Sequence, residues 1–101
     1  MPDLHLKTLK CVTQEDLTFD DDVILKVNGD NVLFTSMDDG ESYKVDQYIS
    51  FTSKAVVKLY EADYNPGDDD DFLGAHTVRS GSGTLHFTRD GANYQLSYAV
   101  S

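Results

Sequence analysis

Apolar residues alternate with polar ones over most of the chain, in short runs separated by Asn, Asp and Gly. Alternation with a period of two places every second side chain on the same face of a β-strand. No long window has the three-to-four-residue period of an amphipathic helix. The pattern therefore predicts an all-β protein built from short strands and tight turns.

The runs predict strands over residues 4–12, 22–28, 32–34, 43–45, 48–52, 55–60, 72–79, 85–87 and 94–100. A change of phase between Leu6 and Leu9 predicts a bulge near Thr8. The Asn-Gly pair after the second run is typical of a tight hairpin turn. Eight or nine strands, spaced roughly ten residues apart, are typical of an antiparallel β-sandwich or a barrel.

The sequence has 101 residues, 40% of them hydrophobic, so we expect one domain over residues 1–101. It contains no apolar stretch long enough to span a membrane. The first residues lack the basic-then-apolar order of a secretory signal, so the expected location is the cytoplasm, with leaderless export as an alternative. Cys11 is the only cysteine and lies in an apolar run, which favours a place in the core.

The chain carries 18 acidic and 8 basic residues, for a formal net charge of -10. Nucleic-acid binding depends on clustered Lys and Arg, and the basic residues here are scattered singly, so nucleic acid is excluded as a partner. The three histidines lie far apart and lack the spacing of zinc ligands. No nucleophile elbow, glycine-rich phosphate loop or metalloprotease helix is present, and we expect no enzymatic activity.

The acidic residues form three clusters in predicted loops: Glu15, Asp16 and Asp20–Asp22, then Asp38, Asp39 and Glu41, and finally Glu61, Asp63 and Asp68–Asp71. The third cluster has six carboxylates in eleven residues and no Lys or Arg. Like charges crowded in this way repel each other and destabilise the fold. A hard cation that prefers many oxygen ligands removes the repulsion, and calcium fits best. The second cluster is more typical of a simple hairpin turn.

Loops of a β-sandwich gather at two ends, so loops far apart in sequence can meet in space. In an antiparallel meander, the loops that follow odd-numbered strands share one end. On the strand count above, the first cluster follows an odd strand and the third cluster follows an even strand. A Greek-key crossover between the sheets is then needed to bring these two clusters together.

Residues 61–74 resemble the third calcium loop of the C2 domain. That family has an acidic-x-acidic pair at a strand end, a short loop, then Asp, two apolar residues and Gly. The corresponding residues are Glu61-Ala62-Asp63 and, eight residues later, Asp71-Phe72-Leu73-Gly74. The first loop also matches, because Asp16 and Asp22 are six residues apart and are followed by a strand.

The resemblance implies an eight-stranded antiparallel Greek-key sandwich that holds Ca²⁺ between these loops. The matched ligand positions are Asp16, Asp22, Glu61, Asp63 and Asp71, with Asp21 as an alternative to Asp22. Backbone carbonyls and water would complete six to eight oxygens. The sequence departs from the family in its longer third loop, in Glu61 where Asp is usual, and in lacking a Lys-rich strand that reads phosphoinositides.

Two hypotheses follow for this eight- to nine-stranded, C2-like β-sandwich. The first is a calcium-binding module that contacts either membrane lipid, through calcium bridging, or a protein partner. The second is a structural or protein-interaction sandwich that needs no metal and has a solvated acidic end. A calcium-dependent melting temperature distinguishes them, because a ligand that binds the folded state stabilises it.

Overall fold

The computed structural model describes residues 1–14, 21–62 and 70–101 of the chain, and these residues form strands and one short 3₁₀ helix. The elements are β1 (Asp3–Thr13), β2 (Asp21–Val27), β3 (Asp30–Met37), β4 (Ser42–Ser50), β5 (Ala55–Glu61), β6 (Asp71–Val78), β7 (Ser82–Phe87), η1 (Arg89–Gly91) and β8 (Asn93–Val100). The prediction of an all-β protein is confirmed. None of the described residues forms a helix with the length and apolar character needed to cross a bilayer.

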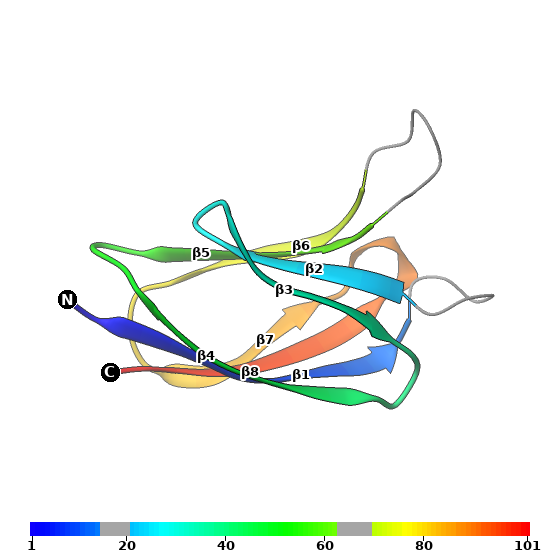
Figure 1. Ribbon diagram of the computed structural model, residues 1–101, viewed down its shortest axis with the longest axis horizontal. Helices are drawn as coiled ribbons and strands as arrows, with labels where there is room; N and C mark the ends of the chain where they lie inside the picture. Colours follow the sequence, from blue (N-terminus) through cyan, green and yellow to red (C-terminus); the bar gives the residue numbers. More distant parts are fainter. Residues whose placement is uncertain (15–20, 63–69) are drawn as a thin grey trace.

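The strands form two four-stranded antiparallel sheets that face each other (Figure 1). One sheet has the order β4-β1-β8-β7, and the other has the order β3-β2-β5-β6. The two halves of the chain contribute strands to both sheets, since the connections β1–β2, β3–β4, β4–β5 and β6–β7 each cross between them. The architecture is the predicted antiparallel sandwich, with eight strands.

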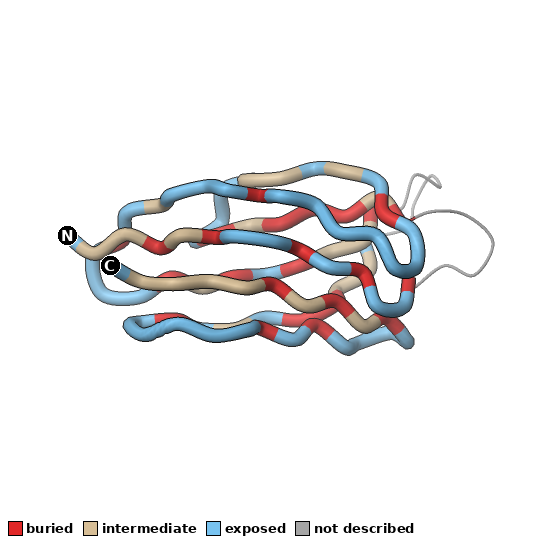
Figure 2. The backbone as a smooth tube through the Cα atoms, turned by 90° about the horizontal axis from the view of Figure 1, so that it is seen from below, coloured by how far each residue is buried: buried red, intermediate tan, exposed pale blue. Residues whose placement is uncertain are grey.

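The core lies between the sheets, and buried residues alternate with more exposed ones along many of the strands (Figure 2). The predicted phase of β2 is confirmed, because Val23, Leu25 and Val27 are all buried. In the opposite sheet, Leu4, Leu6, Leu9 and Cys11 of β1 are fully buried, and the two phases are joined by a register shift between Leu6 and Thr8. The bulge expected near Thr8 is therefore present, and Cys11 is a core residue as predicted.

Residues 42–50 form one strand, β4, where the sequence pattern predicts two short strands. The pattern breaks at Asp46, which has a left-handed backbone with φ of 48°. Asp tolerates this conformation better than most residues. The chain absorbs the irregularity as a bulge, because β4 pairs with β1 on both sides of it: Lys44 faces Thr8 and Gln47 faces Leu6.

Because β4 is a single strand, every connection that follows an odd-numbered strand lies at one end of the sandwich. These connections are β1–β2, β3–β4, β5–β6 and β7–β8, and we call this the acidic end. The other connections and both termini lie at the opposite end (Figure 1). All three acidic clusters follow odd strands, so their described residues reach the same end without the extra crossover that the sequence count required.

Candidate metal centre at the acidic end

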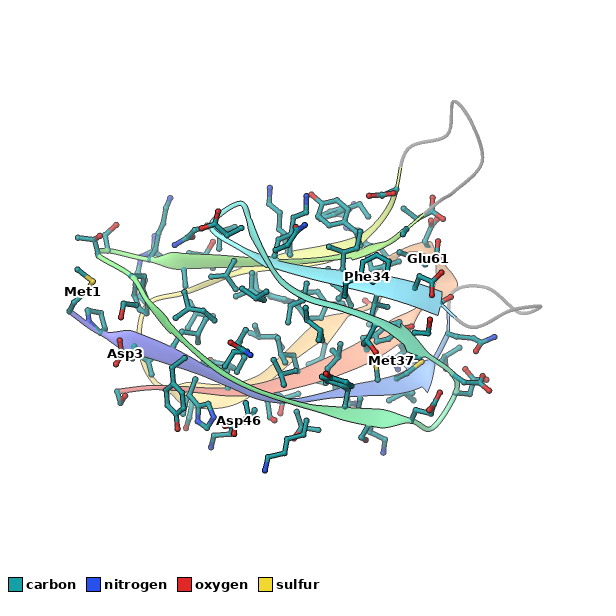
Figure 3. All side chains as sticks on the ribbon, viewed as in Figure 1. Met1, Asp3, Phe34, Met37, Asp46 and Glu61 are labelled. Atoms are coloured by element: carbon teal, nitrogen blue, oxygen red, sulfur yellow. The ribbon has the colours of Figure 1, made fainter. Side chains whose placement is uncertain are left out.

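Strand register brings the described flanks of the first and third acidic clusters together. Val23 of β2 pairs with Glu61 of β5, and Glu61 pairs with Asp71 of β6. The backbone N–H of Ala62 donates to the carbonyl oxygen of Asp22 over 2.7 Å. Figure 3 shows Glu61 at this end of the molecule. Three neighbouring strands therefore carry Asp22, Glu61 and Asp71 to the acidic end.

Asp21 and Asp22 point to opposite faces of their sheet, because successive side chains of a strand alternate. Asp21 has the phase of Val23 and is fully buried, and the Tyr94 hydroxyl donates to its Oδ2 over 2.6 Å. Asp22 has the opposite phase, and the Ser36 hydroxyl donates to its Oδ1. The two candidates for one ligand position thus occupy different surroundings, one in the core and one on the outer face.

A small polar network surrounds the buried carboxylate of Asp21. Burial raises the pKa of the Cys11 thiol to about 11, with a smaller opposing effect from its hydrogen bond to Tyr94. Burial, followed by the hydrogen bond to Asp21, raises the pKa of Tyr94 above its ordinary value. Both groups therefore keep their protons near neutral pH. The Tyr94 hydroxyl is thus available as a donor, and it ties β8 of one sheet to the start of β2 in the other.

The second acidic cluster, Asp38, Asp39 and Glu41, closes the β3–β4 turn. Glu41 Oε1 accepts the backbone N–H of Asp38 over 2.6 Å, and Asp38 Oδ1 accepts that of Asp39 over 2.7 Å. Asp39 Oδ1 in turn accepts the backbone N–H of Gln14 over 2.6 Å. The cluster is thus a turn, but the predicted hairpin is wrong, because β3 and β4 belong to different sheets. Its carboxylates also fasten this connection to the chain segment that leaves β1.

A basic side chain adjoins this end. Arg89 of η1 lies over the ring of Phe72 in β6, 5.3 Å from its centroid. Phe72 directly follows Asp71, so a cation sits beside the start of β6. The sequence places Arg89 in a hairpin connection. Its contact with Phe72 could not be read from the sequence, because the two residues are distant in the chain.

The expected ligand set is described only in part. Asp22, Glu61 and Asp71 lie on described strands, whereas Asp16 and Asp63 lie outside the described residues. Within residues 1–14, 21–62 and 70–101, no three Asp, Glu, His or Cys side chains form a group that could hold a metal ion. The described carboxylates have the oxygen chemistry that Ca²⁺ prefers.

The sequence did not identify Asp21 and Tyr94 as partners. One signal was available, because Asp21 lies two residues before Val23 and so has the phase of the core. Nothing in the sequence indicated that Tyr94 is the partner of Asp21, since Tyr94 lies 73 residues further along the chain.

The fold resembles that of solved C2 domains. A C2 domain structure aligns with a TM-score of 0.57 and 14% identity, over 99% of this chain and 96% of that chain. The structure of human GIVD cytosolic phospholipase A2 in complex with methyl gamma-linolenyl fluorophosphonate inhibitor and terbium chloride aligns with a TM-score of 0.52 and 14% identity. That alignment covers 99% of this chain and 17% of the phospholipase chain.

A scan of the sequence against protein-family models finds no match, and a search of curated proteins finds no significant relative. Identities as low as 14% establish similarity of fold alone. The strand order, the antiparallel pairing and these two structures together give the conclusion that the chain is a C2-like β-sandwich.

Proposed function

We propose that this chain is a non-catalytic calcium-binding module, with Ca²⁺ held at the acidic end by Asp16, Asp22, Glu61, Asp63 and Asp71. Each of these residues supplies carboxylate oxygen, the ligand that Ca²⁺ prefers, and water with backbone carbonyls completes the coordination. Asp21 is engaged with Tyr94 in the core, which favours Asp22 over Asp21 as the ligand from β2.

One observation carries the proposal: strands β2, β5 and β6 bring acidic residues from two separate loops to one end of the sandwich. The register Val23–Glu61–Asp71 and the Ala62 to Asp22 backbone hydrogen bond of 2.7 Å support convergence of the three strand ends, with Glu61 and Asp71 in the phase of Val23 and Asp22 in the opposite phase. Like charges gathered at one end of the sandwich repel each other, so a bound divalent cation would stabilise this end.

The similarity to a C2 domain and to a phospholipase structure that contains terbium chloride supports the same function. The terbium belongs to the phospholipase structure alone. For the present chain we propose that the calcium-loaded end contacts either an anionic lipid surface, with calcium as the bridge, or a protein partner. The acidic end without calcium would be repelled by anionic lipid.

Thermal unfolding tests the proposal directly. Calcium at a hundred times its dissociation constant should stabilise the folded state by about 2.7 kcal/mol. For a domain of this size, we expect the melting temperature to rise by about 10 °C or more. The melt is compared in calcium, in magnesium and in chelator. Equal melting temperatures in all three would contradict calcium binding and favour the metal-independent sandwich.

A matched pair of variants shows where the ion binds. Replacing both Asp63 and Asp71 with Asn should abolish the calcium shift, because two anionic ligands are lost. The control is the double variant Asp30→Asn with Asp46→Asn, which removes the same charge away from the acidic end. Asn tolerates the left-handed backbone of position 46. If both variants lose the shift equally, the effect is general charge screening and not a site.

Vesicle sedimentation separates the two classes of partner. Calcium-dependent binding to vesicles of phosphatidylcholine with phosphatidylserine, absent with phosphatidylcholine alone, supports the lipid target. If calcium raises the melting temperature but the domain binds neither kind of vesicle, the result favours a protein partner.

A further inference from the structure

The outer face of the β3-β2-β5-β6 sheet carries an apolar row that crosses all four strands. The register places Phe34 opposite Ile24, Ile24 opposite Tyr60, and Tyr60 opposite Phe72. Phe34 is 58% exposed, and Figure 3 shows its side chain on β3. The Tyr60 and Phe72 rings lie 5.4 Å apart between centroids. We call Phe34, Ile24, Tyr60 and Phe72 the apolar row.

Two lysines lie beside the apolar row on the same face. Lys26 of β2 is directly opposite Lys58 of β5, and we call them the lysine pair. Like charges directly opposite each other across two strands destabilise a sheet. Lys26 Nζ lies 5.3 Å from the centroid of the Tyr60 ring. Neither lysine forms an ion pair with any residue of the described ranges, although the chain has 18 acidic residues and 8 basic ones.

The lysine pair borders an open pocket of about 470 Å³ that is lined by Lys26, Asn28, Gly29, Val56, Lys58 and Tyr60. Asn28 fixes one side of the pocket. Its Oδ1 accepts the backbone N–H of Val56 over 2.8 Å, and its Nδ2 donates to the carbonyl oxygen of Lys54 over 3.2 Å. These bonds fasten the β2–β3 turn to the start of β5, so the shape of the pocket is set by the fold.

We propose that this face binds a segment of a partner protein in which apolar side chains are followed by Asp or Glu. The apolar side chains would cover Phe34 and its row, and a carboxylate would enter the pocket between the two lysine ammonium groups. Charge complementarity selects this occupant, because a carboxylate relieves the repulsion of the lysine pair and gains two charge-assisted hydrogen bonds. Along β2, Ile24 and Lys26 are two residues apart, or roughly 7 Å, which sets the spacing in the partner.

The same charges argue against other occupants of this face. Anionic membranes attract clusters of about four to eight basic residues, and this face supplies the lysine pair and, at its far edge, Arg89. A second copy of the chain would bring together two molecules with a net charge of -10 each. The site involves none of the proposed calcium ligands, so binding in excess chelator is expected and the test is independent of the calcium proposal.

Selection from a phage library of random dodecapeptides, with the domain immobilised in EDTA, tests the inference. Enriched peptides should carry an acidic residue within a few positions of an apolar one. Their affinity should fall about tenfold or more in the K26E/K58E variant, because two attractive contacts become repulsive. The control K7E/K10E makes the same charge change at exposed positions of β1 in the other sheet and should bind as the wild type does.

A second variant tests the apolar row. Phe34→Ser should weaken the selected peptides several-fold, whereas Tyr43→Ser, at an exposed aromatic position of β4, should not. Thermal melts of all variants check that they fold. Failure to enrich any peptide family, enrichment of basic peptides, or affinity unchanged in K26E/K58E would overturn the proposal. So would lysine-dependent binding to phosphatidylserine vesicles in EDTA, which would identify the ligand as lipid.

Discussion

The two ends of this sandwich are closed by different chemistry. At the opposite end, backbone groups pair directly: Asp3 and Ser101 exchange two hydrogen bonds, of 2.9 and 3.0 Å, and the Phe51 N–H donates to the Pro2 carbonyl over 3.1 Å. The amide side chain of Asn28 adds two further bonds there. At the acidic end, carboxylates add to the backbone hydrogen bonds that hold the connections, among them Asp38, Asp39 and Glu41 of the β3–β4 turn.

The difference shows which end depends on its surroundings. Hydrogen bonds between neutral groups change little with pH or with dissolved ions. They form most of the bonds at the opposite end, where the bond from the Ser50 hydroxyl to the Asp3 carboxylate is an exception, so that end should change less with the solution. Carboxylates that share one end repel each other, and their repulsion changes with protonation and with any bound cation. The acidic end is therefore the place where a solution condition can act on this fold.

The largest expected effect at the acidic end comes from the buried pair of Tyr94 and Asp21. Tyr94→Phe removes the hydroxyl that donates to Asp21 Oδ2 and leaves a fully buried carboxyl group without that donor. Loss of a hydrogen-bond donor to a buried carboxyl group is costly, so we expect the free energy of unfolding to fall by about 3 kcal/mol. Urea denaturation monitored by circular dichroism measures the change.

Tyr98→Phe is the matched control for this variant. Tyr98 lies on the same strand and is partly buried, beyond the acidic network. We expect a loss of about 0.5 kcal/mol from an ordinary, partly solvated hydroxyl. Equal losses in the two variants would mean that Asp21 finds another donor, and the acidic end would then lose its distinctive dependence on Tyr94.

The next effect is alkaline destabilisation of the same network. The pKa of Cys11 rises from 9.0 to about 11 in the folded protein because the thiol is buried. The folded chain therefore holds this proton more tightly than the unfolded chain does. Its contribution to stability is complete below pH 9 and is lost as the pH rises toward 11. We expect a loss of about 2 kcal/mol over this interval, which is most of the ~2.8 kcal/mol that the rise from 9.0 to about 11 corresponds to at about 1.4 kcal/mol per pKa unit.

Tyr94 acts in the same direction, because burial and the bond to Asp21 raise its pKa as well. Urea midpoints measured from pH 8 to pH 11 give the slope of stability against pH. Cys11→Ala removes the thiol contribution, so its stability should fall less steeply over the same range. A variant with an unchanged slope would show that alkaline unfolding begins elsewhere in the chain.

A smaller effect is expected at the opposite end. Asn28→Ala removes the side-chain bonds to Lys54 and Val56 and places Ala at a φ of 50°. We expect a loss of about 1–2 kcal/mol from these two causes together. Asn28→Gly also loses the hydrogen bonds but has no strain at this backbone conformation. Its free energy of unfolding should therefore lie between those of the wild type and of Asn28→Ala. If Asn28→Ala lowers the free energy of unfolding by more than Tyr94→Phe does, the proposed contrast between the two ends is wrong.

Much of the fold could be predicted from local pattern, because alternation fixes which side chains of a strand share a face. Val23, Leu25 and Val27 are buried together as their phase predicts, and Asn28 begins the expected turn. The pattern failed at Asp46, where a bulge within one strand resembles a break between two. That single residue changed the strand count and with it the predicted end of the third acidic loop.

The candidate site was less accessible to sequence reasoning, because its geometry depends on partners distant in the chain. The resemblance matches Asp22 and leaves Asp21 as an alternative, and the contacts with Tyr94 of β8 and Ser36 of β3 show what surrounds each of them. The lysine pair has the same origin. Lys26 and Lys58 become neighbours because β2 and β5 are paired, and no local pattern near either lysine reports that pairing.

The lysine pair gives the smallest expected effect, and its sign is the informative part. Lys58→Glu replaces a like-charge pair with an attractive one, so we expect the protein to become more stable by about 0.5 kcal/mol. Lys10→Glu is the control, because Lys10 faces the neutral residues Ser42 and Gln95 on its neighbouring strands. A gain in stability at position 58 alone would show that this outer face keeps its positive charge at a cost to folding, which is what a binding surface requires. A loss there would mean that the two lysines are already accommodated by the sheet, and the case for an acidic partner would weaken accordingly.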